Sequence, residues 1–289
     1  MTGGSRLPTA RRRPPRVVLG RLVSYLVLVG AMIVALFPVF WTLSTSVKSR
    51  VDTFANPPRF FDFVPTWKNY QNLFDDAQFI TVLKNTVIMT VSSTILCLLV
   101  GGLAAYVLAR RPRFPGRRPL EVVLVLVRAM PGIVLLVPLF NLLSDLGLYD
   151  NRLILVALYA AVNLPFAIWL LTSFFEHVPY ELEESAQVEG ANGWQLATRV
   201  LLPLLGPGLS ATAIFIALLS WNEFLIPVIL AGESSKTLPV FISGFISNRT
   251  LDWGPMAAAS SLAIIPIAFL TVVAQRWLVS GLSSGAVKE

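Results

Sequence analysis

Six long apolar runs dominate this chain, and each is long enough to cross a lipid bilayer as a helix. A hydrocarbon core about 30 Å thick needs roughly 20 apolar residues, because a helix rises about 1.5 Å per residue. The runs lack the alternation of half-buried strands, so an all-α integral membrane protein with six transmembrane helices is predicted. The predicted spans are residues 22–45, 83–109, 119–140, 153–175, 206–231 and 255–279.

The composition agrees with lipid as the main solvent. Of 289 residues, 55% are hydrophobic and only 13% are charged, whereas soluble proteins carry about 25% charged residues. Too few polar side chains remain to cover a folded surface in water. One membrane domain is therefore predicted at residues 22–279, with end segments at 1–21 and 280–289.

The positions of Lys and Arg predict the orientation of the chain. With the N-terminus in the cytoplasm, 14 of the 23 Lys and Arg residues fall in cytoplasmic segments and seven in extracytoplasmic ones. Cytoplasmic loops carry such an excess of positive charge. Both termini are therefore predicted to be cytoplasmic. The net charge of +7 is explained by short runs of Arg beside the spans, which set the topology, so no nucleic-acid partner is expected.

The residues that enzymes use are scarce here. His177 and Cys97 are the single residues of their types, which excludes an internal disulfide and argues against nucleophilic catalysis. No G-x-x-x-x-G-K-[ST] loop is present, so no Walker A site for ATP is predicted. A membrane enzyme would need converging polar groups in the spans, where only Glu223 and Glu121 supply carboxylates. We expect a chain that is not an enzyme and that binds no cofactor or metal.

The predicted cytoplasmic connector at residues 176–205 has the pattern of two short helices. Pro179 suits a first helical turn, and Gly190 suits a left-handed cap at the end of the first helix. Asn192 is suited to capping a second helix that runs to Pro203. Such an amphipathic hairpin fits docking into a groove on another protein. The alternative is a helix lying on the membrane, but that would favour Lys and Arg over the five glutamates found here.

This connector resembles the cytoplasmic loop of permeases in ATP-binding-cassette (ABC) importers. The family pattern is E-A-A, three residues, Gly, nine residues, then I-x-L-P, and the spacing here is identical. Ser and Val replace one Ala and the Ile, which leaves both helices plausible. The residues that the resemblance assigns to coupling with an ATPase are Glu184, Ser185, Ala186, Gly190, Val200, Leu202 and Pro203.

The C-terminal half is similar to MalG-like permeases of the carbohydrate-uptake group. Four segments carry this resemblance: Trp221-Asn222-Glu223-Phe224-Leu225, Lys236-Thr237-Leu238-Pro239, Trp253-Gly254 and Gly281-Leu282-Ser283-Ser284-Gly285-Ala286-Val287-Lys288. The resemblance implies the type I importer permease fold in the bacterial plasma membrane. It also implies a MalF-like second permease, two ATPase subunits that bind ATP and Mg²⁺, and an extracytoplasmic sugar-binding protein.

The function implied is translocation of a sugar, expected to be a di- or oligosaccharide, by alternating access. In the family, the cytoplasmic hairpin inserts into a cleft on the ATPase, whose closure shifts the permease between two states. An importer of the same architecture for glycerol phosphate, a polyamine or another small polar solute stays open as the alternative.

Polar and aromatic side chains inside the spans are candidates for the substrate path. A lone Arg at the bilayer centre costs about 2.5–3.5 kcal/mol on insertion scales, so it should face the bundle interior or a wet cavity. Alternatively it ties helices together through carbonyls or a carboxylate. Asn and Glu can bind sugar hydroxyls, and Trp can cover a sugar ring, but all three also serve as helix contacts or interface anchors. The candidates are Arg128, Asn163, Trp221, Asn222 and Glu223.

Overall fold

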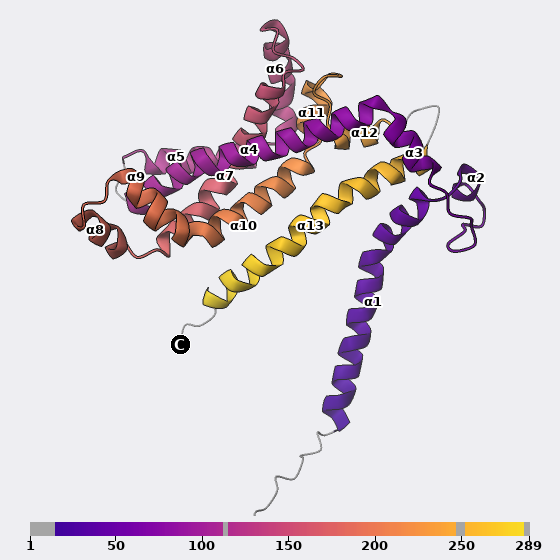
Figure 1. Ribbon diagram of the computed structural model, residues 1–289, viewed down its shortest axis with the longest axis horizontal. Coiled ribbons are helices and arrows are strands. Elements are labelled where there is room, and N and C mark those ends of the chain that lie inside the picture. The colour runs from indigo at the N-terminus through magenta and orange to yellow at the C-terminus, as the bar shows by residue number, and fades with distance from the viewer. Residues whose placement is uncertain (1–14, 112–114, 247–251, 286–289) are drawn as a thin grey trace, which may run out of the picture.

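The computed structural model describes residues 15–111, 115–246 and 252–285, and the regular structure within these ranges is helical (Figure 1). The outermost parts of the predicted cytoplasmic ends, residues 1–14 and 286–289, lie outside them. Five helices are long and apolar enough to cross a bilayer. They are α1 (Pro15–Ser46), α4 (Ala77–Arg110), α7 (Arg152–Glu176), the continuous helix Gly193–Trp221, and α13 (Trp253–Gly285).

A sixth crossing is formed by α5 (Arg117–Ala129) and α6 (Gly132–Asp145), if this bent pair is counted as one span. The remaining elements are short. They are α2 (Arg50–Thr53), α3 (Lys68–Asp75), α8 (Glu181–Val188), α11 (Leu225–Leu230) and α12 (Leu238–Ser243). The helix Gly193–Trp221 is divided into α9 (Gly193–Gln195), the π-helical η1 (Leu196–Leu201) and α10 (Leu202–Trp221).

Helix α4 is at the centre of the bundle and packs against α7, α10 and α12. Asp76 caps its N-terminus by accepting a hydrogen bond from the Gln78 N–H at 2.8 Å. Phe79 and Met89 are fully buried on it, and in a membrane such side chains stabilise the bundle through close packing between helices. Gly101 lets α7 approach closely, since a Cβ there would lie 3.2 Å from the Cβ of Ala167.

The predicted single helix at 119–140 is wrong, because the chain bends by 93° between α5 and α6. Pro131 stands at the bend and has no N–H to donate to the preceding turn. A residue before proline is pushed out of the helical region, and Met130 is extended, with φ −71° and ψ 131°. The proline therefore breaks the span.

The predicted helix at 206–231 is also broken, at residues 222–224 between α10 and α11. Pro227 cannot donate to the carbonyl of Glu223, so the helical ladder is interrupted there. The break also leaves N–H groups free at the start of α11, and the Glu223 side chain accepts a hydrogen bond from one of them, the Ile226 N–H, at 3.1 Å. Asn222 and Glu223 thus lie at a helix break instead of inside a span.

The second hairpin helix does not end at Pro203, contrary to the prediction. Gly193–Trp221 is continuous, and Pro203 lies in the first turn of α10. The six residues before α10 are π-helical. A π-helical turn shifts the hydrogen-bond register, which lets the chain pass a residue without an N–H.

Helix α1 diverges from the rest of the bundle (Figure 1). It contacts α13, yet none of the residues in its most apolar 18-residue window is buried. An apolar helix with no buried face within its own chain must be covered by lipid or by another protein.

Helices α7 and α10 approach closely at Gly208, and this contact gives a stability prediction. A Cβ on Gly208 would overlap the ring of Phe174, whereas one on Gly206 would meet no atom within 4 Å. We expect Gly208→Ala to lower the melting temperature of the purified protein, because overpacking costs about 1–3 kcal/mol. Gly206→Ala on the same helix should leave it unchanged or raise it, since Ala favours a helix over Gly by about 1 kcal/mol. Equal effects of the two substitutions would contradict the close contact.

Candidate functional site

The hairpin at residues 176–205 has the turn that its sequence predicts. Gly190 has a φ of +87°, the left-handed region that side chains disfavour. Its N–H donates to the carbonyl of Gln187 at 3.0 Å, and the Ala191 N–H donates to the carbonyl of Ala186 at 3.0 Å. This is the Schellman arrangement that closes helix C-termini. The predicted glycine cap is confirmed.

The second arm of the hairpin begins with a capping box. The Gln195 N–H donates to Oδ1 of Asn192 at 2.9 Å, and the Asn192 N–H donates to Oε1 of Gln195 at 3.0 Å. These reciprocal bonds satisfy two backbone donors that a helix start leaves free. The predicted cap at Asn192 is confirmed, and residues 189–192 form the turn between the two arms.

A buried ion pair holds the hairpin to α4. Glu183 is fully buried, and Nε of Arg110 lies 2.5 Å from its Oε1. The Tyr106 hydroxyl donates to Oε2 of Glu183 at 3.1 Å, and Nη2 of Arg110 donates to the carbonyl of Val178 at 3.0 Å. Removing one partner of such a pair leaves an uncompensated buried charge, at a cost of about 3–5 kcal/mol. The first arm is therefore rigidly attached.

Nothing in the sequence distinguishes Glu183 from the other four glutamates of the connector. Arg110 is 73 residues away in the chain, and nothing local indicates the pairing. The available signal was the presence of Arg and Glu at the cytoplasmic edges of two predicted spans.

The inner side of the hairpin packs on the bundle, and its outer side is exposed. Ala186 and Val200 contact a buried cluster formed by Ala105 of α4, Leu171 and Phe175 of α7, and Leu196, Leu201 and Leu205. In contrast, Val188 is 88% exposed and Trp194 is 75% exposed. The other residues assigned to coupling are exposed as well: Glu184, Ser185, Gly190, Leu202 and Pro203. The hairpin thus presents an acidic and apolar outer face.

Arg128 lines a groove of about 520 Å³ between α5 and α7. The carbon at the centre of its guanidinium lies 5.4 Å from the ring centroid of Phe166. Trp169 and Glu121 line the same groove. Glu121 forms its ion pair with Arg117, at 2.7 Å. A cation beside an aromatic ring in a groove can bind a polar solute.

Asn163 lies buried between three helices. Its Nδ2 donates to the hydroxyl of Ser220 on α10 at 3.2 Å and to the carbonyl of Tyr159 on its own helix at 3.0 Å. The Ser93 hydroxyl of α4 donates to that of Ser220 at 3.1 Å. These bonds show Asn163 in a contact between helices, which was the alternative to a role in substrate binding. Contact of Asn163 with a substrate stays a prediction.

Trp221 and Asn222 line a second cavity, of about 510 Å³, which is bounded mainly by α12 and α13. Trp221 is only 6% exposed, and its Nε1 donates to the carbonyl of Ala263 at 3.2 Å. Asn222 is exposed, and its Nδ2 donates to the carbonyl of Leu218 at 2.8 Å. The Trp221 N–H and one Asn222 N–H are thus used by carbonyls of the protein. The structure does not bring these two residues together with Arg128, which lines a different cavity.

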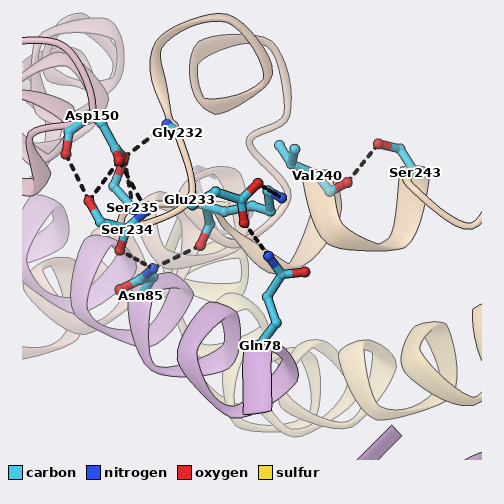
Figure 2. A network of polar contacts seen from close by, with 10 residues as sticks. Gln78, Asn85, Asp150, Gly232, Glu233, Ser234, Ser235, Val240 and Ser243 are labelled. Atoms are coloured by element: carbon cyan, nitrogen blue, oxygen red, sulfur yellow. Dashed lines mark hydrogen bonds and ion pairs between the residues drawn. The ribbon is translucent and has the colours of Figure 1, made fainter. Parts of the chain in front are cut away.

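A polar network joins the loop before α7 to the loop after α11 (Figure 2). It contacts α4 at Asn85, near the N-terminal end of that helix, whereas the hairpin contacts Arg110 at the C-terminal end. Asp150 accepts hydrogen bonds from the backbone N–H groups of Gly232, Ser234 and Ser235, at 2.8, 3.0 and 2.9 Å. The hydroxyls of both serines also donate to this carboxylate. A Cβ on Gly232 would lie 2.7 Å from Oδ2 of Asp150, so the contact needs a glycine there.

Opposing effects set the pKa of Asp150. Partial burial alone would raise the pKa, but the hydrogen bonds from Ser235, Ser234 and Gly232 outweigh it and lower the pKa to about 2. Donors that favour the charged form have this effect. The carboxylate therefore stays ionised, and the two loops stay joined, at any physiological pH.

Long apolar helices around α4 and α7, together with a rigid hairpin that presents an exposed face, define a membrane transport subunit. The chain belongs to the family of binding-protein-dependent transport system inner membrane components, whose model matches residues 98–284. It is therefore a multi-pass protein of the plasma membrane. The predicted family, all-α fold and location are confirmed.

Comparisons with individual proteins agree. The diacetylchitobiose uptake system permease protein DasC of Streptomyces coelicolor is 35% identical over 94% of this chain and 99% of its own. The trehalose transport system permease protein SugB of Mycobacterium tuberculosis is 33% identical over 93% and 98%. A solved bacterial ABC transporter involved in import of the acidic polysaccharide alginate matches with a TM-score of 0.75 and 25% identity, over 93% of this chain and 99% of that one.

The low pKa of Asp150 predicts how its replacement should depend on pH. Asp150 has a φ of +58°, a conformation that Asn also tolerates, so Asp150→Asn keeps the backbone and removes the charge together with one acceptor oxygen. We expect this variant to melt at a lower temperature than the wild type, by a constant difference between about pH 5 and 8. A group with a depressed pKa stabilises the fold above its unfolded pKa, so the difference should shrink only as the pH falls from about 4 towards 2. Differential scanning of the purified protein tests this, and a difference that already vanishes near pH 6 would contradict it.

Proposed function

We propose that this chain is a permease subunit of an ABC importer that moves a di- or oligosaccharide across the plasma membrane by alternating access. The observation that carries the proposal is the hairpin. It matches the family's coupling loop residue for residue in spacing, it is joined to α4 by a buried ion pair, and its outer face is exposed. A rigid element of this kind can transmit the closure of a partner into the bundle.

The partner at the hairpin is, in this proposal, a cytoplasmic ATPase present in two copies. ATP and Mg²⁺ bind on that subunit, and hydrolysis takes place there. The exposed side chains of Val188 and Trp194 supply apolar contact area, and Glu184 supplies a carboxylate for a basic residue of the partner. Aromatic anchors surrounded by polar groups are typical of the residues that dominate binding energy.

A MalF-like second permease is the proposed partner within the membrane. The apolar surface of α1, which its own chain leaves uncovered, is a surface that a second permease can cover. An extracytoplasmic binding protein, as the family description implies, would deliver the solute.

The two broken spans mark the proposed translocation path. Irregular backbone at membrane depth is tolerated where it is buried in protein or lines a water-filled cavity, and transporters place substrate sites at such discontinuities. The bend at Met130 lies two residues after Arg128, and the second break contains Asn222 and Glu223. These polar residues are proposed to line the path together with residues of the second permease.

A sugar is the proposed solute because relatives of this chain are named for sugar uptake. DasC is named for diacetylchitobiose and SugB for trehalose, and the similar solved transporter imports alginate. Aromatic rings beside hydrogen-bonding groups, as in the groove of Arg128, suit carbohydrates. A small polar solute such as glycerol phosphate is the second candidate, since Arg128 supplies a cation for a phosphate group.

Replacement of Gly190 tests the coupling role of the hairpin. A β-branched side chain is strained at positive φ, so Gly190→Val should distort the turn. In the complex purified with its ATPase, second permease and binding protein, we expect loss of the ATPase or of ATP hydrolysis stimulated by the binding protein. The two permeases should stay paired. Gly193→Val is the matched control, because Gly193 is helical and a Cβ there meets no atom within 4 Å. Unchanged assembly and stimulation in Gly190→Val would remove the main support for the proposal.

Replacement of Arg128 tests the substrate path. Loss of a charged hydrogen-bond donor costs about 1.5–3 kcal/mol, equal to about a ten- to hundredfold change in an equilibrium constant. We expect Arg128→Gln to weaken solute uptake into proteoliposomes by about that factor, while the ATPase remains bound. Arg118→Gln removes an exposed cation from the same helix and should keep normal uptake. Equal uptake by the two variants would exclude Arg128 from the path.

A further inference from the structure

Helix α4 is attached at both ends to the segments that face the two sides of the membrane. At its cytoplasmic end, Arg110 and Tyr106 bind Glu183 of the hairpin. At the other end, Nδ2 of Asn85 donates to the carbonyls of Ser234 and Lys236, both at 2.9 Å. Asn85 is only 1% exposed. Both attachments therefore use buried polar groups, which tolerate little displacement.

The segment of α4 between these attachments is continuous. It contains no proline, unlike the two spans that are broken. Asn85 and Arg110 are 25 residues apart, which corresponds to about 38 Å along a helix. Packing against α7 runs along α4, and Ser93 adds the hydrogen bond to Ser220. A movement imposed on one end of such a helix reaches the other end.

The geometry of the cytoplasmic attachment suits the transfer of movement between the hairpin and α4. Arg110 binds two points of the hairpin region at once, the Glu183 carboxylate and the Val178 carbonyl. Its guanidinium carbon also lies 5.9 Å from the ring centroid of Tyr180. The planar guanidinium fixes the direction of these bonds. Glu183 is buried and Glu184 is exposed, so these adjacent acids lie on different sides of α8. Glu183 faces the bundle, and Glu184 is free to contact a partner.

We propose that Arg110 and Glu183 are positioning residues that transfer movement of the hairpin to α4, and that α4 carries this movement to the loop at residues 231–238. This inference rests on the proposed function, because it requires an ATPase at the hairpin. It adds the route by which docking and translocation are coupled. Both side chains are buried between the hairpin and α4, away from the exposed face of the hairpin. Their loss should therefore separate ATP hydrolysis from transport, which a role in folding alone would not do.

The test uses the complete complex in proteoliposomes, first shown to hydrolyse ATP in response to the binding protein. Failure at that step would count against the proposed function and not against this inference. Arg110→Gln then alters α4 and leaves the exposed face of the hairpin intact. Arg111→Gln is the matched control, because Arg111 is the next residue and is exposed. The measured quantity is the amount of solute imported per ATP hydrolysed.

We expect Arg110→Gln to keep the ATPase bound and to lower this ratio at least tenfold, with Arg111→Gln like the wild type. An unchanged ratio would overturn the inference, and so would release of the ATPase, since the pair would then serve only to keep the hairpin folded. If the permease with Arg110→Gln does not fold and pair with the second permease, the double variant Arg110→Gln, Glu183→Gln removes both charges and leaves no unpaired one. It should assemble and show the same low ratio, and a normal ratio in that variant would overturn the inference as well.

Discussion

A bilayer offers no water to satisfy backbone N–H and C=O groups, and this constraint underlies the architecture of the chain. It forces every crossing of this chain into a helix. Wherever a proline interrupts the hydrogen bonds of such a helix, the neighbouring backbone groups need other partners or another geometry. The chain meets that demand in different ways. At Pro227 the Glu223 side chain caps the following helix, and before Pro203 the helix passes into a π-helical register. At Pro131 the chain turns sharply instead.

Features that depend on neighbouring residues could be predicted from the sequence. The apolar runs indicate the crossings, and the hairpin caps at Gly190 and Asn192 follow from local backbone chemistry. The effect of proline could not be predicted in the same way. Pro138 and Pro165 lie inside continuous helices, whereas Pro131 and Pro227 accompany breaks. Whether a proline breaks a membrane helix depends on which neighbouring groups satisfy the freed carbonyl, and the sequence alone does not show those neighbours.

The contacts between segments that are distant in the chain could not be predicted from the sequence either. Glu183 pairs with a residue 73 positions earlier, and Asp150 binds the loop 82–85 positions later. Of the substrate-path candidates, Asn163 can bind sugar hydroxyls and Trp221 can cover a sugar ring, and the polar groups of both are costly to leave unpaired in lipid. The structure shows that their hydrogen-bonding groups are engaged within the protein. A high cost in lipid therefore identifies residues that need a partner, and that partner is as readily another helix as a solute.

The divergence of α1 has a consequence for how this helix can associate. Its own chain buries none of its most apolar window, so lipid covers this surface unless another membrane protein packs against it. Lipid tails are as apolar as the side chains that they cover, so any such association would depend on close packing and hydrogen bonds and not on the hydrophobic effect. The bundle around α4 would not have to open for it.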